Sequence, residues 1–265
     1  PGPTTPPHPP VHDPDQLLGI ASVDPKVPFD PRDVIARVVD GSAFDEFKPL
    51  YGTSLVTGWA SIHGFPVGIL ANARGILFSE EAEKGSQFIQ LANQIDTPLI
   101  FLQNTTGFMV GAEYEQGGII KDGAKMIMAQ SCSRVPKFTV MCNGSFGAGN
   151  YGMCGRGYDP DFLYTFPNAK MGVMGGEQAG KTMSMVARGK AKAAGQEPDE
   201  AAIAKQEAWL TKLFDDQSDA FYCSGHLMDD GMIDPRDTRD VIAMSLSACY
   251  NNKVEGTKEY GTWRM

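Results

Sequence analysis

The segment GSFGAGNYGMCGRGYDP (residues 144–160) carries five glycines and one alanine within its first thirteen residues. It directly follows KFTVMCN (137–143), an apolar run that is typical of a buried strand. A backbone with so few side chains suits binding of a phosphate, binding of a developing oxyanion, or close packing of a helix against strands. The residues alone favour the last two purposes about equally.

This part of the chain contains partial matches to two nucleotide-binding motifs. GAGNYG has the glycine spacing of a dinucleotide fingerprint (Gly147, Gly149, Gly152), but no following strand ends in an acid that would bind the ribose. GEQAGKT (176–182) ends like a P-loop, yet its first glycine would be Gly175 and no strand leads cleanly into it. We interpret both as chance matches.

Outward from the glycine-rich segment, the same order of elements recurs. The apolar runs 97–104 and 135–143 each lead into a glycine-containing loop, and a helical stretch at 119–134 follows the first loop. Because parallel strands need crossover connections, this order predicts an α/β fold with parallel strands.

Further elements flank this repeat. We expect a hairpin from the runs 54–64 and 65–72, and a helix at 79–96 that is capped by Ser79 with Glu83 in reach. Asp30 is a candidate N-cap, with Pro31 at the first helical position. The remaining predicted elements are a strand region at 161–175, helices at 199–217 and 239–251, and a tail at 259–265.

The start of the chain differs from the rest. Residues 1–28 are rich in proline and polar residues and show no periodicity, which predicts an extended linker to an upstream segment. Residues 29–265 are then expected to form a single domain.

Composition limits the partners. A formal charge of −9 argues against nucleic-acid binding and against an acidic membrane surface, because the field would repel phosphates. The five cysteines are odd in number and widely spaced without a C-x-x-C pair, so we expect reduced thiols and neither disulfides nor a metal site. No apolar run is long enough for a membrane span.

Three segments carry a family resemblance: 101–126 (FLQNTTGFMVGAEYEQGGIIKDGAKM), 144–180, and the C-terminal DDGMIDPRDTRDVIAMSLSA with GTWRM. Together they resemble the C-terminal half of the carboxyltransferase (β) subunit of biotin-dependent acyl-CoA carboxylases. The wording QNTTGFMVG and GNYGMCGR is most similar to methylcrotonyl-CoA carboxylase, with geranyl-CoA carboxylase a near neighbour. The resemblance covers essentially everything after the proline-rich start.

The resemblance implies a crotonase-like fold (ClpP/crotonase superfamily), a spiral of repeated ββα units. It also implies a site between the N-domain of one subunit and the C-domain of another. There, carboxybiotin releases carbon dioxide, its ureido group takes a proton from the acyl-CoA, and the resulting dienolate captures the carbon dioxide. Two oxyanions form, so two oxyanion holes are needed.

By position, the backbone amides of Ala148 and Gly149 resemble the hole for the biotin ureido oxygen. Gly107, Phe108 and Gly147 are the further residues expected to contact biotin. Since such a hole acts through its backbone, we expect the side chain of Ser145 to matter far less.

The implied partners are the N-terminal carboxyltransferase half, the α subunit that carries biotin carboxylase and biotin, and further copies of the β subunit. The substrate would be a branched enoyl-CoA such as methylcrotonyl-CoA, whose choice in this family rests largely in the other half. The implied location is the cytoplasm of a bacterium or the mitochondrial matrix of a eukaryote.

Other conspicuous residues have ordinary explanations. His63 and His226 lack a nucleophile at a recognisable spacing, which favours structural roles. Arg156 and Lys181 suit salt bridges better than a ligand contact, while Glu177 with Gln178 suits closing the biotin pocket. The methionines follow the apolar periodicity and suit gap-filling in a core or interface; they are Met126, Met128, Met171, Met174, Met183 and Met185.

Two rival functions stay open. One is a stand-alone crotonase-type hydratase or hydrolase, for which Glu113 and Glu115 are the candidate carboxylates. The other is a non-catalytic assembly domain in which the glycines serve packing alone.

Overall fold

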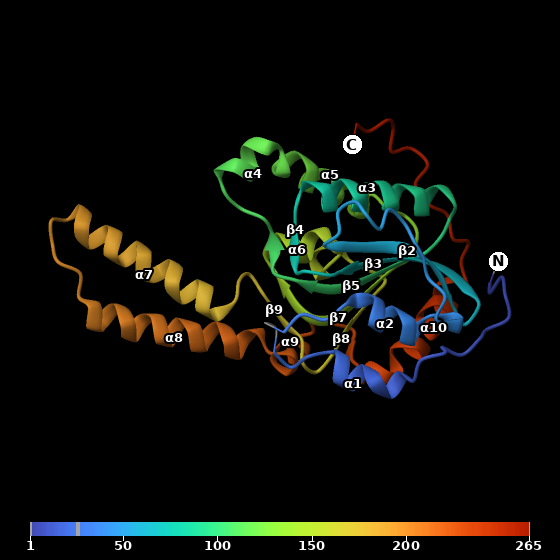
Figure 1. Cartoon of the computed structure of the whole chain (residues 1–265). Helices are drawn as coiled ribbons and strands as arrows, with labels where there is room; N and C mark the ends of the chain where they lie inside the picture. Colours follow the sequence, from blue (N-terminus) through green and yellow to red (C-terminus); the bar gives the residue numbers. More distant parts are fainter. Residues whose placement is uncertain (1, 25–26, 265) are drawn as a thin grey trace.

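The computed structural model describes residues 2–24 and 27–264, and a twisted sheet lies at its centre (Figure 1). Within the described residues, eight strands join in the order β1-β2-β3-β5-β7-β8-β10, with β9 paired to the far end of β7. Their bounds are β1 Asp45–Glu46, β2 Leu55–Ile62, β3 Phe65–Asn72, β5 Leu99–Thr105, β7 Lys137–Phe146, β8 Phe162–Thr165, β9 Lys170–Gly172 and β10 Gly231–Met232. The pairs from β3 to β10 are parallel, which confirms the predicted α/β fold.

The predicted hairpin is confirmed as β2 and β3. The strands pair antiparallel from Leu55 opposite Asn72 to Ile62 opposite Phe65. His63 and Gly64 form the turn, with φ of 48° and 79°. Both residues of a type I′ turn need positive φ, and its backbone matches the twist of the strands.

Helices cover both faces of the sheet. One face carries α3 (Ser79–Gln94) and α5 (Ile119–Ser131), and the other carries α1 (Leu17–Ile20), α2 (Pro31–Val38) and α10 (Thr238–Cys249) (Figure 1). At α2 the prediction is confirmed, since Asp30 accepts a hydrogen bond from the amide of Arg32 and Pro31 is the first helical residue.

The predicted cap of α3 is wrong. Phe78, rather than Ser79, is the N-cap residue. Its amide donates to Glu81 Oε2 (3.1 Å), and Glu81 Oε1 also accepts from the amide of Ser54 (2.9 Å). Glu83 instead accepts from the hydroxyl of Tyr51 at 2.5 Å. A carboxylate in the first turn thus replaces the serine because it satisfies both the helix and the neighbouring loop.

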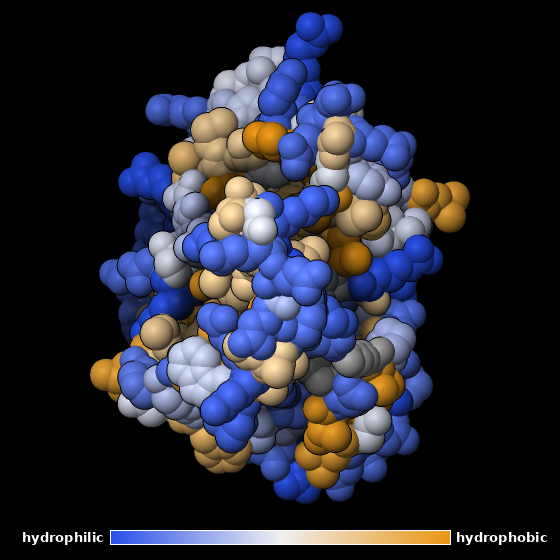
Figure 2. Space-filling view, turned by 90° about the vertical axis from the view of Figure 1, so that its left-hand side faces the viewer, coloured by the Kyte–Doolittle hydropathy of each residue, from blue (hydrophilic) through white to orange (hydrophobic). Residues whose placement is uncertain are grey.

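A two-helix arm projects from the body (Figure 1). It consists of α7 (Gly176–Ala193), which the sequence did not predict, and α8 (Glu200–Ser218). The helices touch at Gly180, where an added Cβ would lie 2.5 Å from the hydroxyl of Thr211. Figure 2 views the molecule from the side of the arm and shows separate groups of apolar residues among hydrophilic ones.

The N-terminal segment packs on the domain instead of remaining an extended linker. Residues Pro14–Gln16 form a 3₁₀ turn that leads into α1, and Leu17 is 1% exposed within the core. The amide of Thr4 donates to the carbonyl of Gly64 at 2.9 Å. The prediction of an extended segment is therefore wrong for 14–20, because a four-residue helix with a single buried leucine gives too weak a periodic signal.

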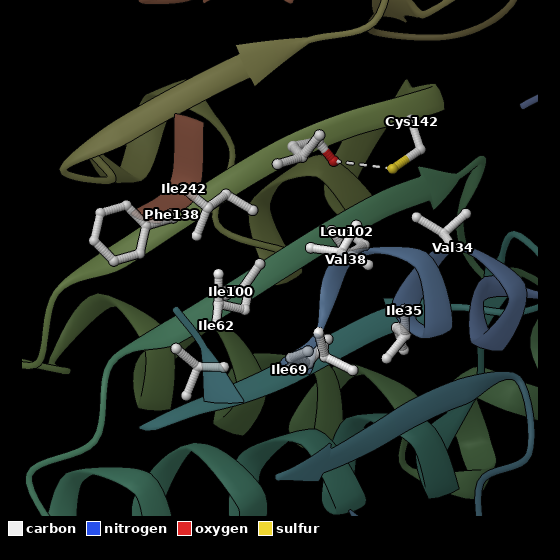
Figure 3. Close-up of a cluster of buried hydrophobic side chains, with 14 of the residues drawn as sticks. Val34, Ile35, Val38, Ile62, Ile69, Ile100, Leu102, Phe138, Cys142 and Ile242 are labelled. Atoms are coloured by element: carbon white, nitrogen blue, oxygen red, sulfur yellow. Dashed lines mark hydrogen bonds between the residues drawn. The ribbon is translucent and has the colours of Figure 1, made fainter. Parts of the chain in front are cut away.

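The core has a layer on each side of the sheet. On one side, Ile69, Ile100 and Phe138 from three strands meet Ile35 and Ile242 from the covering helices (Figure 3). On the other side, Leu70, Phe101 and Met126 pack with residues of α3 and α5. Alternate residues of β3 and β5 thus enter opposite layers, as a sheet buried on both faces requires.

No helix within the described ranges combines the length and apolarity that crossing a bilayer requires.

Candidate functional site

The glycine-rich segment forms the end of a strand and a short helix rather than a loop. β7 continues to Phe146, three residues beyond the predicted strand end, and α6 (Gly147–Gly152) begins at the next residue. The backbone reverses at Gly147, whose φ is 54°. An added Cβ there would also lie 3.2 Å from the carbonyl oxygen of Val173, so glycine makes the abrupt entry into α6 possible.

The first turn of α6 is the candidate oxyanion hole. The first amides of a helix have no partner within the helix, and within the described part of the chain no side chain caps this one. Ala148 is exposed, whereas Gly149 is buried. The start of α6 therefore combines free donor capacity with the positive end of the peptide dipoles, which suits a negative oxygen.

Gly149 marks the side of α6 that faces the neighbouring strand. An added Cβ would lie 2.5 Å from Thr105 Oγ1 and 2.9 Å from the Cα of Gly107. The amide of Gly107 donates to Thr105 Oγ1 at 3.2 Å. Gly149 and Gly107 are thus brought together, and the lack of a side chain at Gly149 lets α6 approach the end of β5.

The side chain of Phe108 points toward α5 and α6 and does not line the cavity at the start of α6. Gly107 and Phe108 form β6 (Gly107–Phe108), which pairs in parallel with β4 (Ile76–Leu77). The Phe108 ring lies against Gly123 of α5 and Gly152 of α6, where an added Cβ would be 3.3 Å and 3.0 Å from it. The Phe108 side chain therefore packs between α5 and the end of α6.

A cavity of about 580 Å³ opens at the start of α6. Gly147, Ala148 and Asn150 line it on one side. Tyr151 of α6 also lines it. The other walls come from β9 and its surroundings, the end of α8, and α9 (Ala220–Gly225) with the residues after it. Their lining residues are Met171, Gly172, Val173, Gln217, Tyr222, Cys223, His226 and Met228. Of the five predicted site residues, Gly147 and Ala148 line this cavity, and Gly149, Gly107 and Phe108 lie behind it.

The far wall of the cavity was missed from the sequence. Tyr222 and His226 stack with their ring centroids 4.3 Å apart, and His226 Nδ1 lies 2.8 Å from the carbonyl oxygen of Tyr222. Since a carbonyl only accepts, Nδ1 carries the proton. Burial raises the pKa of the neighbouring Cys223 thiol. The four-residue spacing of Tyr222 and His226 was a usable helical signal, but nothing in it indicated a cavity.

Glu177, Gln178 and Lys181 line a second cavity of about 660 Å³ at the start of α7. Lys181 Nζ and Glu177 Oε1 are 2.6 Å apart, and this hydrogen bond raises the pKa of Lys181. Phe146 lines the second cavity while Gly147 lines the first. The three residues therefore line a cavity beside the one at α6, and none of them lines the α6 cavity itself.

The side chains of Arg156 and His63 are engaged with carboxylates. Arg156 makes two 3.1 Å contacts with the carboxylate of Asp230, which also accepts from the amide of Leu163. His63 Nε2 lies 2.8 Å from Asp240 Oδ1. These contacts support the structural interpretation.

The two carboxylates of the rival hydrolytic function lie elsewhere. Glu113 and Glu115 belong to α4 (Ala112–Gly117), none of whose residues is buried, and neither lines the cavity at α6. Across the described residues, no three His, Cys, Asp or Glu side chains are grouped as a metal site.

Under α6 lies a buried polar network that the sequence did not reveal. Asn150 Nδ2 donates to Ser145 Oγ (2.7 Å), the Ser145 hydroxyl donates to Gln103 Oε1, and Gln103 Nε2 donates to the carbonyl of Met153 (2.7 Å). Gln103 and Ser145 are both 0% exposed. A glutamine near the end of an apolar strand was the available signal, but its partners are up to fifty residues away.

The chain is similar to known proteins over most of its length. A family model described as carboxyl transferase domain matches residues 1–261. The chain is 58% identical, over 97% of its length, to the probable biotin-dependent acyl-coenzyme A carboxylase beta2 subunit of Mycobacterium tuberculosis. It is 52% identical, again over 97%, to the mitochondrial methylcrotonoyl-CoA carboxylase beta chain of Dictyostelium discoideum. It covers 48% and 44% of these two proteins, so the chain spans about half the length of the curated relatives.

Solved structures give the same result. The geranyl-CoA carboxylase β subunit of P. aeruginosa superposes with a TM-score of 0.86 at 40% identity, covering 97% of this chain and 49% of that one. The transcarboxylase 12S structure, described as a hexamer assembly with hydrolysed methylmalonyl-coenzyme A bound, gives 0.81 at 32% identity over 93% of this chain and 47% of that one.

Proposed function

The chain belongs to the carboxyl transferase domain family, and we propose that it forms the biotin-binding half of a carboxyltransferase β subunit that carboxylates an acyl-CoA. The observation that best supports this function is the uncapped start of α6, which enters a cavity at Gly147 and Ala148. A reaction whose main demand is stabilisation of an oxyanion needs such backbone donors more than it needs acid or base side chains.

The cavity suits biotin. When bound, carboxybiotin would supply the carboxyl group and would present a ureido oxygen that needs hydrogen-bond donors. The amides of Ala148 and Gly149 would donate to that oxygen, while Met171, Val173 and Met228 offer apolar walls to the rest of the ring system. The missing side chain of Gly149 would support the hole by permitting its close approach to the backbone of Gly107.

We propose a branched enoyl-CoA such as methylcrotonyl-CoA as the substrate. This is supported by the methylcrotonoyl-CoA carboxylase relatives, which are 50–52% identical to the chain. The proposed partners are the N-terminal carboxyltransferase half, an α subunit with biotin carboxylase and biotin carrier, and further β subunits. The proposed location is the cytoplasm in a bacterium, or the mitochondrial matrix in a eukaryote, as the names of the eukaryotic relatives support.

The test is incorporation of labelled bicarbonate into methylcrotonyl-CoA. The complete β subunit with its α subunit and ATP is expected to carboxylate, whereas this chain without the other half is expected not to, since only one of the two required oxyanion holes would be present. Absence of carboxylation by the complete enzyme with any branched acyl-CoA contradicts the proposal, as does turnover by this chain alone.

A first mutational prediction concerns Ala148→Val. The substitution keeps the amide but adds bulk at an exposed position beside the hole. We expect the affinity of the complete enzyme for free biotin to fall by about tenfold or more, since close approach is needed for the hydrogen bond. The melting temperature should stay nearly unchanged, as it should in the control Ala201→Val on the exposed surface of α8. A large loss of stability with unchanged affinity would instead support a pure packing role.

A further inference from the structure

We propose that Gln103 and Ser145, acting through Asn150, are positioning residues that aim the amides of α6 at the ureido oxygen. The inference rests on the proposed carboxyltransferase function. It concerns the buried network at α6, in which Gln103 and Ser145 do not line the cavity, so neither the cavity lining nor the ligand chemistry by itself would single these two residues out.

α6 has little capacity to set its own direction. It is six residues long, and its sequence GAGNYG contains three glycines. Helices this short are unstable alone, and each interior glycine costs about 1 kcal/mol relative to alanine. With no side-chain cap in the described structure either, the orientation of α6 must come from its tertiary contacts.

The network supplies such contacts at two points of α6. Asn150 is tied by its amide nitrogen to Ser145, and Met153, directly after the helix, is tied by its carbonyl to Gln103. Ser145 and Gln103 are joined by a hydrogen bond of their own, so both attachments end on the central strands β7 and β5.

The donors and acceptors of the network have only one consistent arrangement. The carbonyl of Met153 only accepts, so the amide nitrogen of Gln103 must face it and Gln103 Oε1 must face Ser145. The Ser145 hydroxyl then donates to Gln103, which leaves its oxygen free to accept from Asn150. A rotated amide at Gln103 would place two acceptors against each other, so the network resists alternative orientations of α6.

Gln103 and Ser145 act only through α6. Both are 0% exposed and neither lines the cavity, so neither side chain touches a ligand there. Asn150 does line the cavity, and for that reason the test is placed on the other two residues. The proposal gives the Ser145 side chain a larger role than the sequence suggested, where it was expected to matter far less than the backbone amides.

The experiment uses the complete enzyme and measures kcat, the KM for acyl-CoA, and hydrogen–deuterium exchange of residues 147–153. Gln103→Met keeps the side-chain volume and removes both of its hydrogen bonds, and Ser145→Ala removes the link. Each is expected to lower kcat by about tenfold or more, because small misplacements of catalytic groups are costly, while KM changes less than about twofold. Exchange at 147–153 should accelerate in both variants.

Thr57→Val is the matched control. Its hydroxyl is likewise fully buried and donates to a backbone carbonyl, that of Phe47 at 3.0 Å, but it lies on β2. We expect a comparable loss of melting temperature with unchanged kcat and unchanged exchange at 147–153. An equal loss of kcat in Thr57→Val would overturn the proposal, because general destabilisation would then explain the effect.

Gln103→Glu provides a rescue and a pH profile. Burial raises the pKa of a carboxyl group, and the protonated form offers the one donor and the one acceptor that the network uses from the amide. Its kcat is expected to exceed that of Gln103→Met and to decline relative to wild type as the pH rises. The kcat of the double variant of Gln103→Met and Ser145→Ala should be no more than about twofold below that of the less active single variant, since both substitutions break the same network.

Two failures remain distinguishable. Wild-type kcat in folded Gln103→Met or Ser145→Ala, or full additivity in the double variant, overturns the positioning role while the carboxyltransferase function stands. Absence of carboxylation by the wild-type enzyme itself refutes the proposed function instead.

Discussion

Gly149 shows how one missing side chain determines the position of a helix. Gly149→Ala would place a Cβ 2.5 Å from Thr105 Oγ1 and 2.9 Å from the backbone of Gly107, so α6 would have to move. We expect carboxyl transfer by the complete enzyme to fall about 100-fold, as for loss of an oxyanion-hole donor, and the stability to fall by about 1–3 kcal/mol.

The control for Gly149 is Gly157→Ala in the same glycine-rich segment. Its added Cβ would meet the Tyr151 ring at 3.5 Å, which is ordinary contact. Rates and melting temperatures measured side by side should leave Gly157→Ala near wild type. Equal effects of the two substitutions would remove the special role of Gly149.

The cysteines should differ sharply in reactivity. Burial raises the pKa of both Cys142 and Cys154 to about 12, whereas Cys132 is exposed. Because the thiolate is the reactive form, iodoacetamide at neutral pH should label Cys132 first and leave Cys142 and Cys154 unmodified until the protein unfolds. Peptide mass spectrometry with and without denaturant measures this order. Early labelling of either buried thiol in the native protein contradicts it.

At the scale of residues, sequence reasoning selected the backbone of the candidate site but not its surroundings. Gly147, Ala148 and Gly149 are contiguous, so their composition was visible at once. Gln103 and Tyr222 come near α6 only through the fold, and neither carries a local pattern that indicates this. Side chains that act through long-range contacts leave no spacing to read.

Among the elements, those with strong periodicity or sharp turn chemistry were predicted. The hairpin at His63 and Gly64, α5 and α8 fall into this group. α7 was missed because its glycines at 176, 180 and 189 weaken helical propensity, although two of them allow close contact with α8. The end of β7 was placed too early, since glycine and serine there suggested a loop while pairing with β9 keeps the strand extended.

The C-terminal segment is bound to the residues after α3 through the carboxylate of Asp96. Asp96 Oδ1 accepts from the amide of Gly256 (2.8 Å) and from Lys258 (2.5 Å), and these bonds lower the pKa of Asp96. A carboxylate with a lowered folded pKa stabilises the fold above its unfolded pKa of about 3.9, and this contribution disappears as the pH falls through the folded value.

We therefore expect Asp96→Asn to melt below wild type at pH 7, with the difference shrinking toward about pH 3. Thermal unfolding across that range measures it. Asp216→Asn, which removes a partner of Lys212 on the exposed surface of α8, should differ little from wild type throughout. A difference for Asp96→Asn that stays constant with pH would contradict the assignment.

Across the whole molecule, one buried ion pair joins segments that are far apart in sequence. Arg239 of α10 lies 2.5 Å from Asp40, and it also donates to the carbonyls of His8 and Val38. Asp40 in turn accepts from the amides of His63 and Gly64. The pair thus fixes the N-terminal segment, α2 and the hairpin turn to α10.

Arg239→Met should lower the stability by about 3 kcal/mol, because it leaves a buried carboxylate without its cation. Arg236→Met is the matched control three residues earlier, where the exposed guanidinium pairs with Asp234. Denaturant unfolding of both variants is expected to show a large shift for the first and little for the second. Similar shifts would mean that the buried pair has no special weight.

Gly155 and Asn150 limit which substitutions the sequence can accept at positions 155 and 150 during evolution. A Cβ at Gly155 would lie 1.9 Å from Asn150 Oδ1, so a side chain at position 155 forces the Asn150 side chain to leave its place or to be replaced. Replacing Asn150 first removes its hydrogen bond to Ser145. Whichever of the two positions is substituted first, the single variant has a disturbed network at α6. Under selection for activity, the two residues should therefore be inherited together and lost together.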